Sequence, residues 1–186
     1  MKNIKKILLL SDAFFLLSGG LLGPIYALFV NKIGGDLLDA SGAFAFFMLT
    51  AGAVVFLLAF WEDKIKHQRI FVIAGYGISM IGTAGYLLVD SPSSLFIVEI
   101  ILGLAVALKD PAYDELFSLA GKRHLTLAWG EWEAVDYLAL GGGAFVGGLI
   151  AEFLGFQTLL WCMLVLSVFS FASSLFLLKV QEGRNG

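Results

Sequence analysis

Residues 40–61 read ASGAFAFFMLTAGAVVFLLAFW, an uninterrupted apolar stretch without a charged side chain. A helix of about 20 residues, rising about 1.5 Å per residue, is long enough to cross the hydrocarbon core of a bilayer. This stretch therefore predicts a membrane-spanning helix. Five further segments are predicted to be such helices: 7–30, 70–89, 94–113, 125–154 (continuously apolar from about 134) and 156–178.

The composition of the whole chain supports the same interpretation. Its 186 residues are 59% hydrophobic and 15% charged, and the mean hydropathy is +0.90. Soluble domains have about 45–50% apolar and about 25% charged residues, which excludes an ordinary water-soluble fold. The apolar segments are continuous and not alternating, which favours helices over a closed barrel. The sequence predicts an all-α membrane protein, with residues 1–186 forming one domain of six transmembrane helices.

The basic residues lie on one side of this predicted bundle. If the amino terminus is cytoplasmic, the connections on that side hold ten of the twelve basic residues: Lys2, Lys5, Lys6, Lys64, Lys66, Arg69, Lys122, Arg123, Lys179 and Arg184. Cytoplasmic connections of membrane proteins carry an excess of lysine and arginine. We therefore expect a multi-pass protein of the plasma (inner) membrane with both termini in the cytoplasm.

Charges inside the apolar segments sort the helices into two groups. A charged group at the bilayer centre costs roughly 2.5–3.5 kcal/mol on insertion scales, so such groups face other helices or a wet cavity. Segments 70–89 and 156–178 carry none and are expected to face lipid. The first, fourth and fifth helices are expected to line an interior, because they hold the following charged residues: Asp12, Glu99, Lys109, Asp110, Glu131, Glu133, Asp136 and Glu152.

Three of these acids are expected to lie near the inner mouth of a cavity. Asp12, Asp110 and Asp136 are close to the cytoplasmic ends of their helices, and Lys109 is their natural ion-pair partner. Asp12 is the leading candidate for exchanging a proton with a substrate, and a structural ion pair with Lys109 is the alternative. Glu99 lies apart, in the outer half of the fourth helix.

Other side chains are candidates for contact with a substrate or for movement. Tyr26 and Tyr137 are able to stack on a substrate, with core packing as the alternative, and Glu133 is a candidate for the cavity mouth. Small residues four positions apart allow close helix packing, so two glycine pairs indicate packing surfaces: Gly19 with Gly23, and Gly143 with Gly147. Two prolines are expected to bend or end their helices: Pro24 and Pro111.

The motifs of common enzymes are missing from the sequence. It contains no nucleophile elbow, no H-E-x-x-H zinc motif and no cysteine pair, and the glycine-rich stretch GGGAFVGG lies inside a predicted spanning helix. His67 and His124 have no second ligand at metal spacing. We therefore expect no enzyme activity, no cofactor or metal, and no nucleic-acid partner.

Three stretches carry a resemblance to a known family. GGLLGPIYALFV (19–30) is similar to the first helix of major facilitator superfamily transporters. AFWEDKIKHQ (59–68) is similar to the loop motif G-x-x-x-D-[RK]-x-G-R-[RK], in which Asp63 and Lys64 match. In the fourth helix the family carries R-x-x-x-G, followed eight residues later by proline. EIILGLAVALKDP (99–111) keeps this glycine and this proline as Gly103 and Pro111, but Glu99 stands in place of the arginine.

The fifth helix resembles the antiporter pattern G-x8-G-x3-G-P-x2-G of the same family. Gly130, Gly143 and Gly147 match it, while Ala139 and Ala144 replace the second glycine and the proline. The resemblance implies gating roles for the matching loop residues Asp63 and Lys64. The glycine track on the fifth helix is assigned to packing and gating.

The resemblance covers nearly the whole chain, but it corresponds to one half of a transporter of this family. It implies a secondary transporter that works by alternating access, with membrane lipid and a small-molecule substrate as partners. The excess of buried acids suggests proton coupling. We expect a parallel homodimer, joined through the second and fifth helices by Gly52 and the Gly143/Gly147 track, to enclose the acids. The alternatives are a heterodimer, a longer chain, and a membrane scaffold without transport activity.

Overall fold

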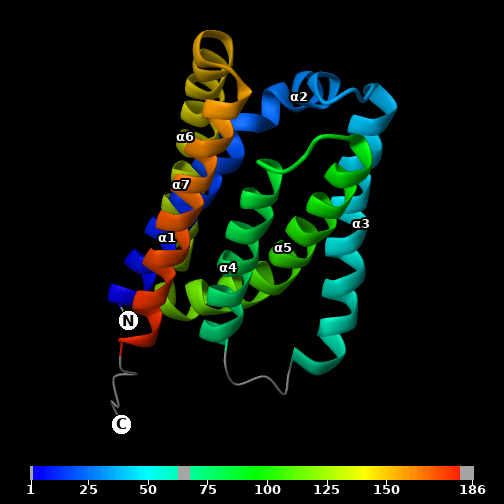
Figure 1. Ribbon diagram of the computed structural model, residues 1–186. Coiled ribbons are helices and arrows are strands. Elements are labelled where there is room, and N and C mark those ends of the chain that lie inside the picture. Colours follow the sequence, from blue (N-terminus) through cyan, green and yellow to red (C-terminus); the bar gives the residue numbers. More distant parts are fainter. Residues whose placement is uncertain (1, 63–67, 181–186) are drawn as a thin grey trace.

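The computed structural model describes residues 2–62 and 68–180, and every regular element in these residues is helical (Figure 1). The prediction of an all-α membrane fold is confirmed. The elements are α1 (Lys2–Leu22), the 3-10 turn η1 (Gly23–Ile25), α2 (Tyr26–Lys32), α3 (Leu37–Glu62), α4 (Gln68–Tyr86), α5 (Pro92–Gly121), α6 (Leu125–Leu154), α7 (Phe156–Ser174) and the 3-10 turn η2 (Leu175–Leu178).

Five of the described segments are long and apolar enough to cross a membrane: Asn3–Lys32, Leu37–Phe60, Pro92–Gly121, Leu125–Leu154 and Phe156–Leu178. Helix α4 is less apolar because glycines and hydroxyl-bearing side chains occupy one of its faces. Residues Tyr76, Ser79, Thr83 and Tyr86 are buried on that face. The helix nevertheless lies within the bundle, packed against α5 and α7.

The two prolines have different effects on the chain. Pro24 lies in η1, which separates α1 from α2, and α2 crosses the end of the bundle opposite the start of α1 (Figure 1). Pro111, by contrast, lies inside α5, which runs on to Gly121 and not only to 113 as expected. Tyr113 and Phe117 in this extension are buried, so packing stabilises a helix whose hydrogen-bond ladder the proline interrupts.

The helices form a bundle with two apolar cores. Helices α1, α6 and α7 lie on one side, α4 and α5 in the middle and α3 on the other side (Figure 1). One core surrounds Phe29, Tyr86 and Leu159 at the α2 end of the bundle. The second core surrounds Leu8 and Phe117 at the end where α1 begins.

The expected division between lipid-facing and interior helices needs a correction. Helix α4 was expected to face lipid, but its buried polar face points into the bundle. Charge counting missed this face because its polar groups are hydroxyls. Helix α6 was expected to line an interior, but α6 and α3 are the most open helices: only 11% of the most apolar 18-residue stretch of each is buried, against 33–39% in the other candidate spans.

Candidate functional site

Asp12 of α1 accepts hydrogen bonds from three other helices. Its side chain is 1% exposed. Tyr76 of α4 donates its hydroxyl to Oδ1 at 3.0 Å, and the Lys109 ammonium of α5 donates to the same oxygen at 3.0 Å. Trp132 of α6 donates its indole N–H to Oδ2 at 2.7 Å. A single carboxylate therefore joins α1, α4, α5 and α6.

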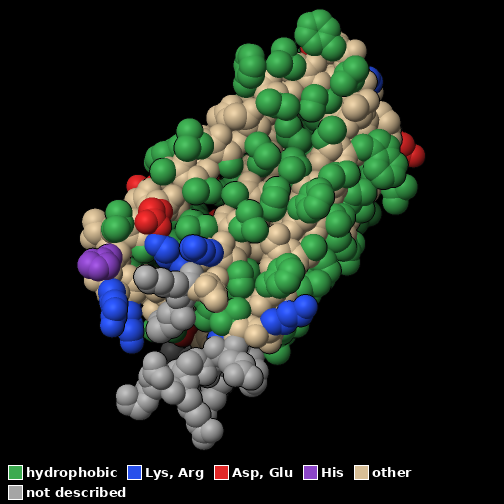
Figure 2. All heavy atoms as spheres, turned by 90° about the vertical axis from the view of Figure 1, so that its left-hand side faces the viewer, with side chains coloured by type: hydrophobic (Ala, Val, Ile, Leu, Met, Phe, Trp, Pro, Cys, Tyr) green, Lys and Arg blue, Asp and Glu red, His purple; other side chains and the backbone are tan. Residues whose placement is uncertain are grey.

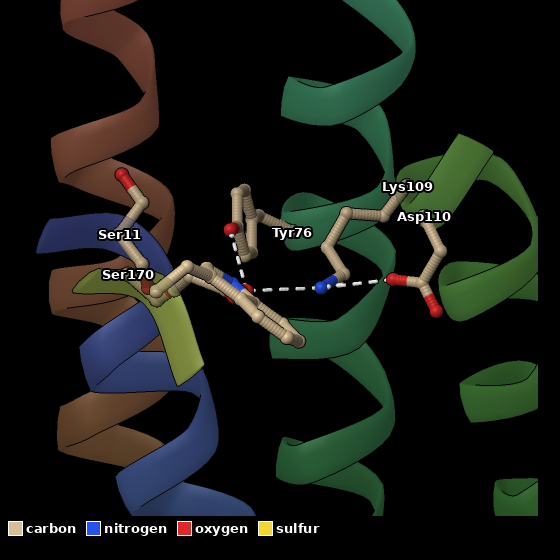
Figure 3. Close-up of polar contacts among 7 residues, drawn as sticks. Ser11, Tyr76, Lys109, Asp110 and Ser170 are labelled. Atoms are coloured by element: carbon tan, nitrogen blue, oxygen red, sulfur yellow. Dashed lines mark hydrogen bonds and ion pairs between the residues drawn. The ribbon is translucent and has the colours of Figure 1, made fainter. Parts of the chain in front are cut away.

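Lys109 is paired on both sides (Figure 3). Besides its ion pair with Asp12, its ammonium contacts Oδ1 of Asp110 at 2.9 Å. The ammonium also lies 4.3 Å from the ring centroid of Phe15 and 5.3 Å from that of Tyr113. Aromatic faces attract a cation, so this buried charge is compensated in several directions. The ion pair expected between Asp12 and Lys109 is present, and Asp110, half-exposed, is attached to it.

Two buried hydroxyls near this network lack a hydrogen-bond partner within the described part of the chain. They are the hydroxyl of Tyr113, which is 2% exposed, and the hydroxyl of Ser11. The backbone carbonyl of Ser11 accepts a hydrogen bond from Ser170 of α7 at 2.7 Å. Tyr113 therefore offers a natural comparison with Tyr76, whose hydroxyl is bonded.

Glu99 of α5 forms a second and different site at the α2 end of the bundle. Its side chain is 5% exposed. Tyr26 and Tyr86 donate their hydroxyls to the same oxygen, Oε1, at 2.5 and 2.7 Å. Tyr26 is the first residue of α2, so the turn at Pro24 brings it to Glu99. Among the described residues, no lysine or arginine pairs with Glu99.

Among the described residues, the remaining candidates on α6 form no hydrogen bond or ion pair with either site. Asp136 is half-buried, and within the described residues it has no hydrogen-bond or ion-pair partner. Glu133 is exposed, and Tyr137 is 70% exposed. Of the three aspartates expected to cluster, Asp12 and Asp110 meet through Lys109, and Asp136 interacts with the charges of Asp12 and Lys109 without an ion pair or hydrogen bond in the described residues. Glu133 and Tyr137 face the surface of α6, whereas Asp136 lies one helical turn beyond Trp132 and is close enough to Asp12 and Lys109 to interact with their charges.

The glycine pairs also differ from expectation. Gly143 and Gly147 pack against α1: a Cβ on Gly143 would lie 2.9 Å from the carbonyl oxygen of Leu17, and one on Gly147 would overlap that of Leu21. Their packing role is confirmed, but this face of α6 is occupied within the chain and cannot form the expected interface between subunits. Gly19, Gly23 and Gly52, by contrast, have open space around them: no atom lies within 4 Å of an added Cβ.

The gating candidates Asp63 and Lys64 lie outside the described residues. The structure adds functional candidates that the sequence analysis did not single out as ligands of the acids: Tyr76, Tyr86 and Trp132. On α4 the signal was a stripe of polar residues at steps of three and four, from Tyr76 to Tyr86. Among residues 2–62 and 68–180, no three histidine, cysteine, aspartate or glutamate side chains are grouped to hold a metal ion.

Comparison with known proteins identifies relatives of this chain. Residues 8–186 match the Major Facilitator Superfamily. A curated relative, described as an uncharacterized MFS-type transporter of Methanocaldococcus jannaschii, is 27% identical over 146 residues. The match covers 76% of this chain but only 37% of that relative, so the chain spans well under half of the relative's length.

Proposed function

The chain belongs to the major facilitator superfamily, and from this premise we propose that it takes part in proton-coupled transport of a small molecule by alternating access. The superfamily consists of membrane transporters and not of enzymes. The observation that carries the proposal is Glu99, a buried carboxyl group in a membrane-spanning helix, which is bonded to two tyrosines and, among the described residues, to no cation. An intramembrane acid of this kind marks a proton or substrate pathway.

Proton exchange at Glu99 changes the charge beside the apolar core at the α2 end of the bundle. The ionised carboxylate attracts the hydroxyls of Tyr26 and Tyr86, and the neutral acid holds them less strongly, since hydrogen bonds to a charged group are the stronger ones. Tyr26 begins α2 and Tyr86 ends α4. We therefore assign Glu99 the proton-binding role and these two tyrosines the role of transmitting its charge state.

The Asp12 network has a different assignment. Its carboxylate and the ammonium of Lys109 neutralise each other, and three helices donate to the carboxylate. We assign this network to holding α1, α4, α5 and α6 together. Asp110, which is half-exposed and paired with Lys109, links this network to the surface of the protein.

The open faces of α3 and α6 support a parallel homodimer. They expose large apolar side chains together with Glu133 and Tyr137. Acids facing acyl chains are costly, and a second copy would enclose them between subunits around a two-fold axis. With Gly143 and Gly147 occupied by α1, Gly52 and the α6 face bearing Glu133 and Tyr137 remain for the contact. A separate partner chain or a continuation of this chain would cover the same faces.

Proteoliposomes under a proton gradient test the transport proposal. With ethidium as a fluorescent lipophilic cation and an entrapped pH dye, the wild type is expected to couple ethidium movement to proton flow. Glu99→Gln should lower the gradient-driven rate at least ten-fold, and Glu152→Gln, an exposed acid on α6, is the matched control. Coupled movement that survives Glu99→Gln contradicts the assignment of the proton site.

Two further results separate the alternatives. A protein that moves neither ethidium nor protons, while its helices remain folded, favours a membrane scaffold in which both acids only join helices. The detergent-corrected mass of the purified chain tests the dimer. A strict monomer contradicts the homodimer and leaves a partner chain or a longer polypeptide to cover α3 and α6.

A further inference from the structure

A groove lies at the end of the bundle where α1 begins and η2 ends. Its volume is about 320 Å³, and its lining comes from the two ends of the described chain: Asn3, Lys6, Ile7, Phe176, Lys179 and Val180. Among the described residues, this lining contains two basic residues, one amide, three apolar residues and no acid. Neither of the polar sites described above includes any of these residues.

One wall of this terminal groove is held in place from α4. The guanidinium of Arg69 donates to the backbone carbonyl of Val180 at 2.7 Å and to that of Leu177 at 3.4 Å. Leu177 is fully buried, and the ammonium of Lys179 lies 5.3 Å from the ring centroid of Phe176. The backbone that carries Lys179 is therefore fixed beside the first turns of α1.

The charge of the groove is positive and accessible. Lys6 and Lys179 are both exposed, whereas the neighbouring Lys5 is already paired with Glu131 of α6. On the face that Figure 2 shows, most lysine and arginine side chains gather at this end, and hydrophobic side chains cover the middle. Basic residues at the ends of membrane-spanning helices lie at the level of the lipid headgroups.

An apolar track leads from the groove along the seam between α1 and α7. Leu10 and Phe14 follow Lys6 at steps of four and so lie on the same face of α1. The rings of Phe14 and Phe169 of α7 are 5.6 Å apart. Leu10 is 52% exposed, and so is Phe169. A molecule with a negative headgroup in the groove can thus place an acyl chain on this track.

We propose that the terminal groove binds the headgroup of an anionic phospholipid, with Lys6 and Lys179 contacting the phosphate. The amide of Asn3 adds a hydrogen-bond donor to the same group. The Leu10, Phe14 and Phe169 track holds an acyl chain. This site is independent of the proposed transport activity, because it shares no residue with Asp12, Glu99 or their partners.

Native mass spectrometry of the purified chain in non-ionic detergent tests the site with phosphatidylglycerol as the probe. The wild type is expected to bind one phosphatidylglycerol at least ten-fold more tightly than phosphatidylcholine. Near an anionic lipid surface a lysine contributes about five-fold in affinity. Lys6→Gln and Lys179→Gln should therefore each weaken binding by about five-fold.

The control is the double variant Lys122→Gln/Arg123→Gln, which removes two charges from the same end of the bundle but outside the groove. Its affinity for phosphatidylglycerol should be unchanged. Equal losses in the control and in the Lys6→Gln/Lys179→Gln variant would mean diffuse attraction and would overturn the site. Equal binding of the two lipids would overturn it as well. Displacement of the lipid by inorganic phosphate at equal concentration would reassign the groove to the free anion.

Discussion

The two buried carboxyl groups of this protein lie in similar apolar surroundings but differ in how their charge is compensated. Asp12 has an ammonium at 3.0 Å and two neutral donors, whereas Glu99 has two tyrosine hydroxyls and no cation among the described residues. Burying a charge without a partner is expensive. The difference teaches that burial alone does not select a candidate proton site; we propose Glu99 because no cation among the described residues compensates its charge.

Removing the Lys109 cation from the Asp12 site is expected to have the largest effect on the stability of the protein. Lys109→Met leaves Asp12 buried without its counter-ion, and breaking a buried ion pair in this way costs about 3–5 kcal/mol. Thermal unfolding in detergent measures the loss, and Lys122→Met at an exposed position serves as the control. The double variant Asp12→Leu/Lys109→Met removes both charges but leaves the Tyr76 hydroxyl and the Trp132 N–H without their acceptor, so it should recover only part of the stability. A Lys109→Met protein as stable as the wild type would remove the distinction between the two sites.

A smaller effect is expected at the tyrosine that donates to Asp12. Tyr76→Phe removes a hydrogen bond to an ionised carboxylate, worth about 1.5–3 kcal/mol. Tyr113→Phe is the matched control, because that buried hydroxyl has no partner in the described chain and its removal should be neutral or slightly stabilising. Equal losses in the two variants would show that ring packing and not the bond to Asp12 decides the outcome.

The smallest effect is expected at the corresponding tyrosine of the second site. Tyr86→Phe should cost only about 0.5–1.5 kcal/mol, the value for a bond between neutral groups, if Glu99 carries a proton in the resting protein. Glu99→Gln should likewise remain stable, because an amide oxygen accepts the same two hydroxyls. Comparing the unfolding of Tyr86→Phe with that of Tyr76→Phe therefore reports the charge of each carboxyl group. A larger loss for Tyr86→Phe would contradict a neutral Glu99.

The helices and the Asp12–Lys109 ion pair were predictable from the sequence, since charges are rare in apolar segments and must find each other there. The ligands supplied by α4 were not, because tyrosines are common in membrane helices and only packing decides which carboxyl group they reach. Asp136 also shows that packing, and not sequence spacing, decides which contacts a residue makes. Helical spacing placed it on one stripe with Gly143 and Gly147, but packing buried the glycines against α1 and left Asp136 unbonded.

The expected end of the fourth helix at 113 failed for a related reason. Pro111 is a strong local signal for a break, yet Tyr113 and Phe117 find buried positions beyond it. Local signals in the backbone are overridden when tertiary burial offsets one lost hydrogen bond. At Pro24 the helix is interrupted: the three residues of η1 contain no buried residue, and buried side chains return only at Phe29 and Val30 of α2.

The glycine contact between α1 and α6 has a mechanical consequence. Because the two backbones touch at Gly143 and Gly147, with no side chain between them to deform, α1 and α6 are expected to shift together as one body. The first joint beyond that body is the turn at Pro24, and Tyr26 follows it directly. A movement of α6 would therefore also move α1. Through the turn at Pro24 it would shift Tyr26, whose hydroxyl is bonded to Glu99.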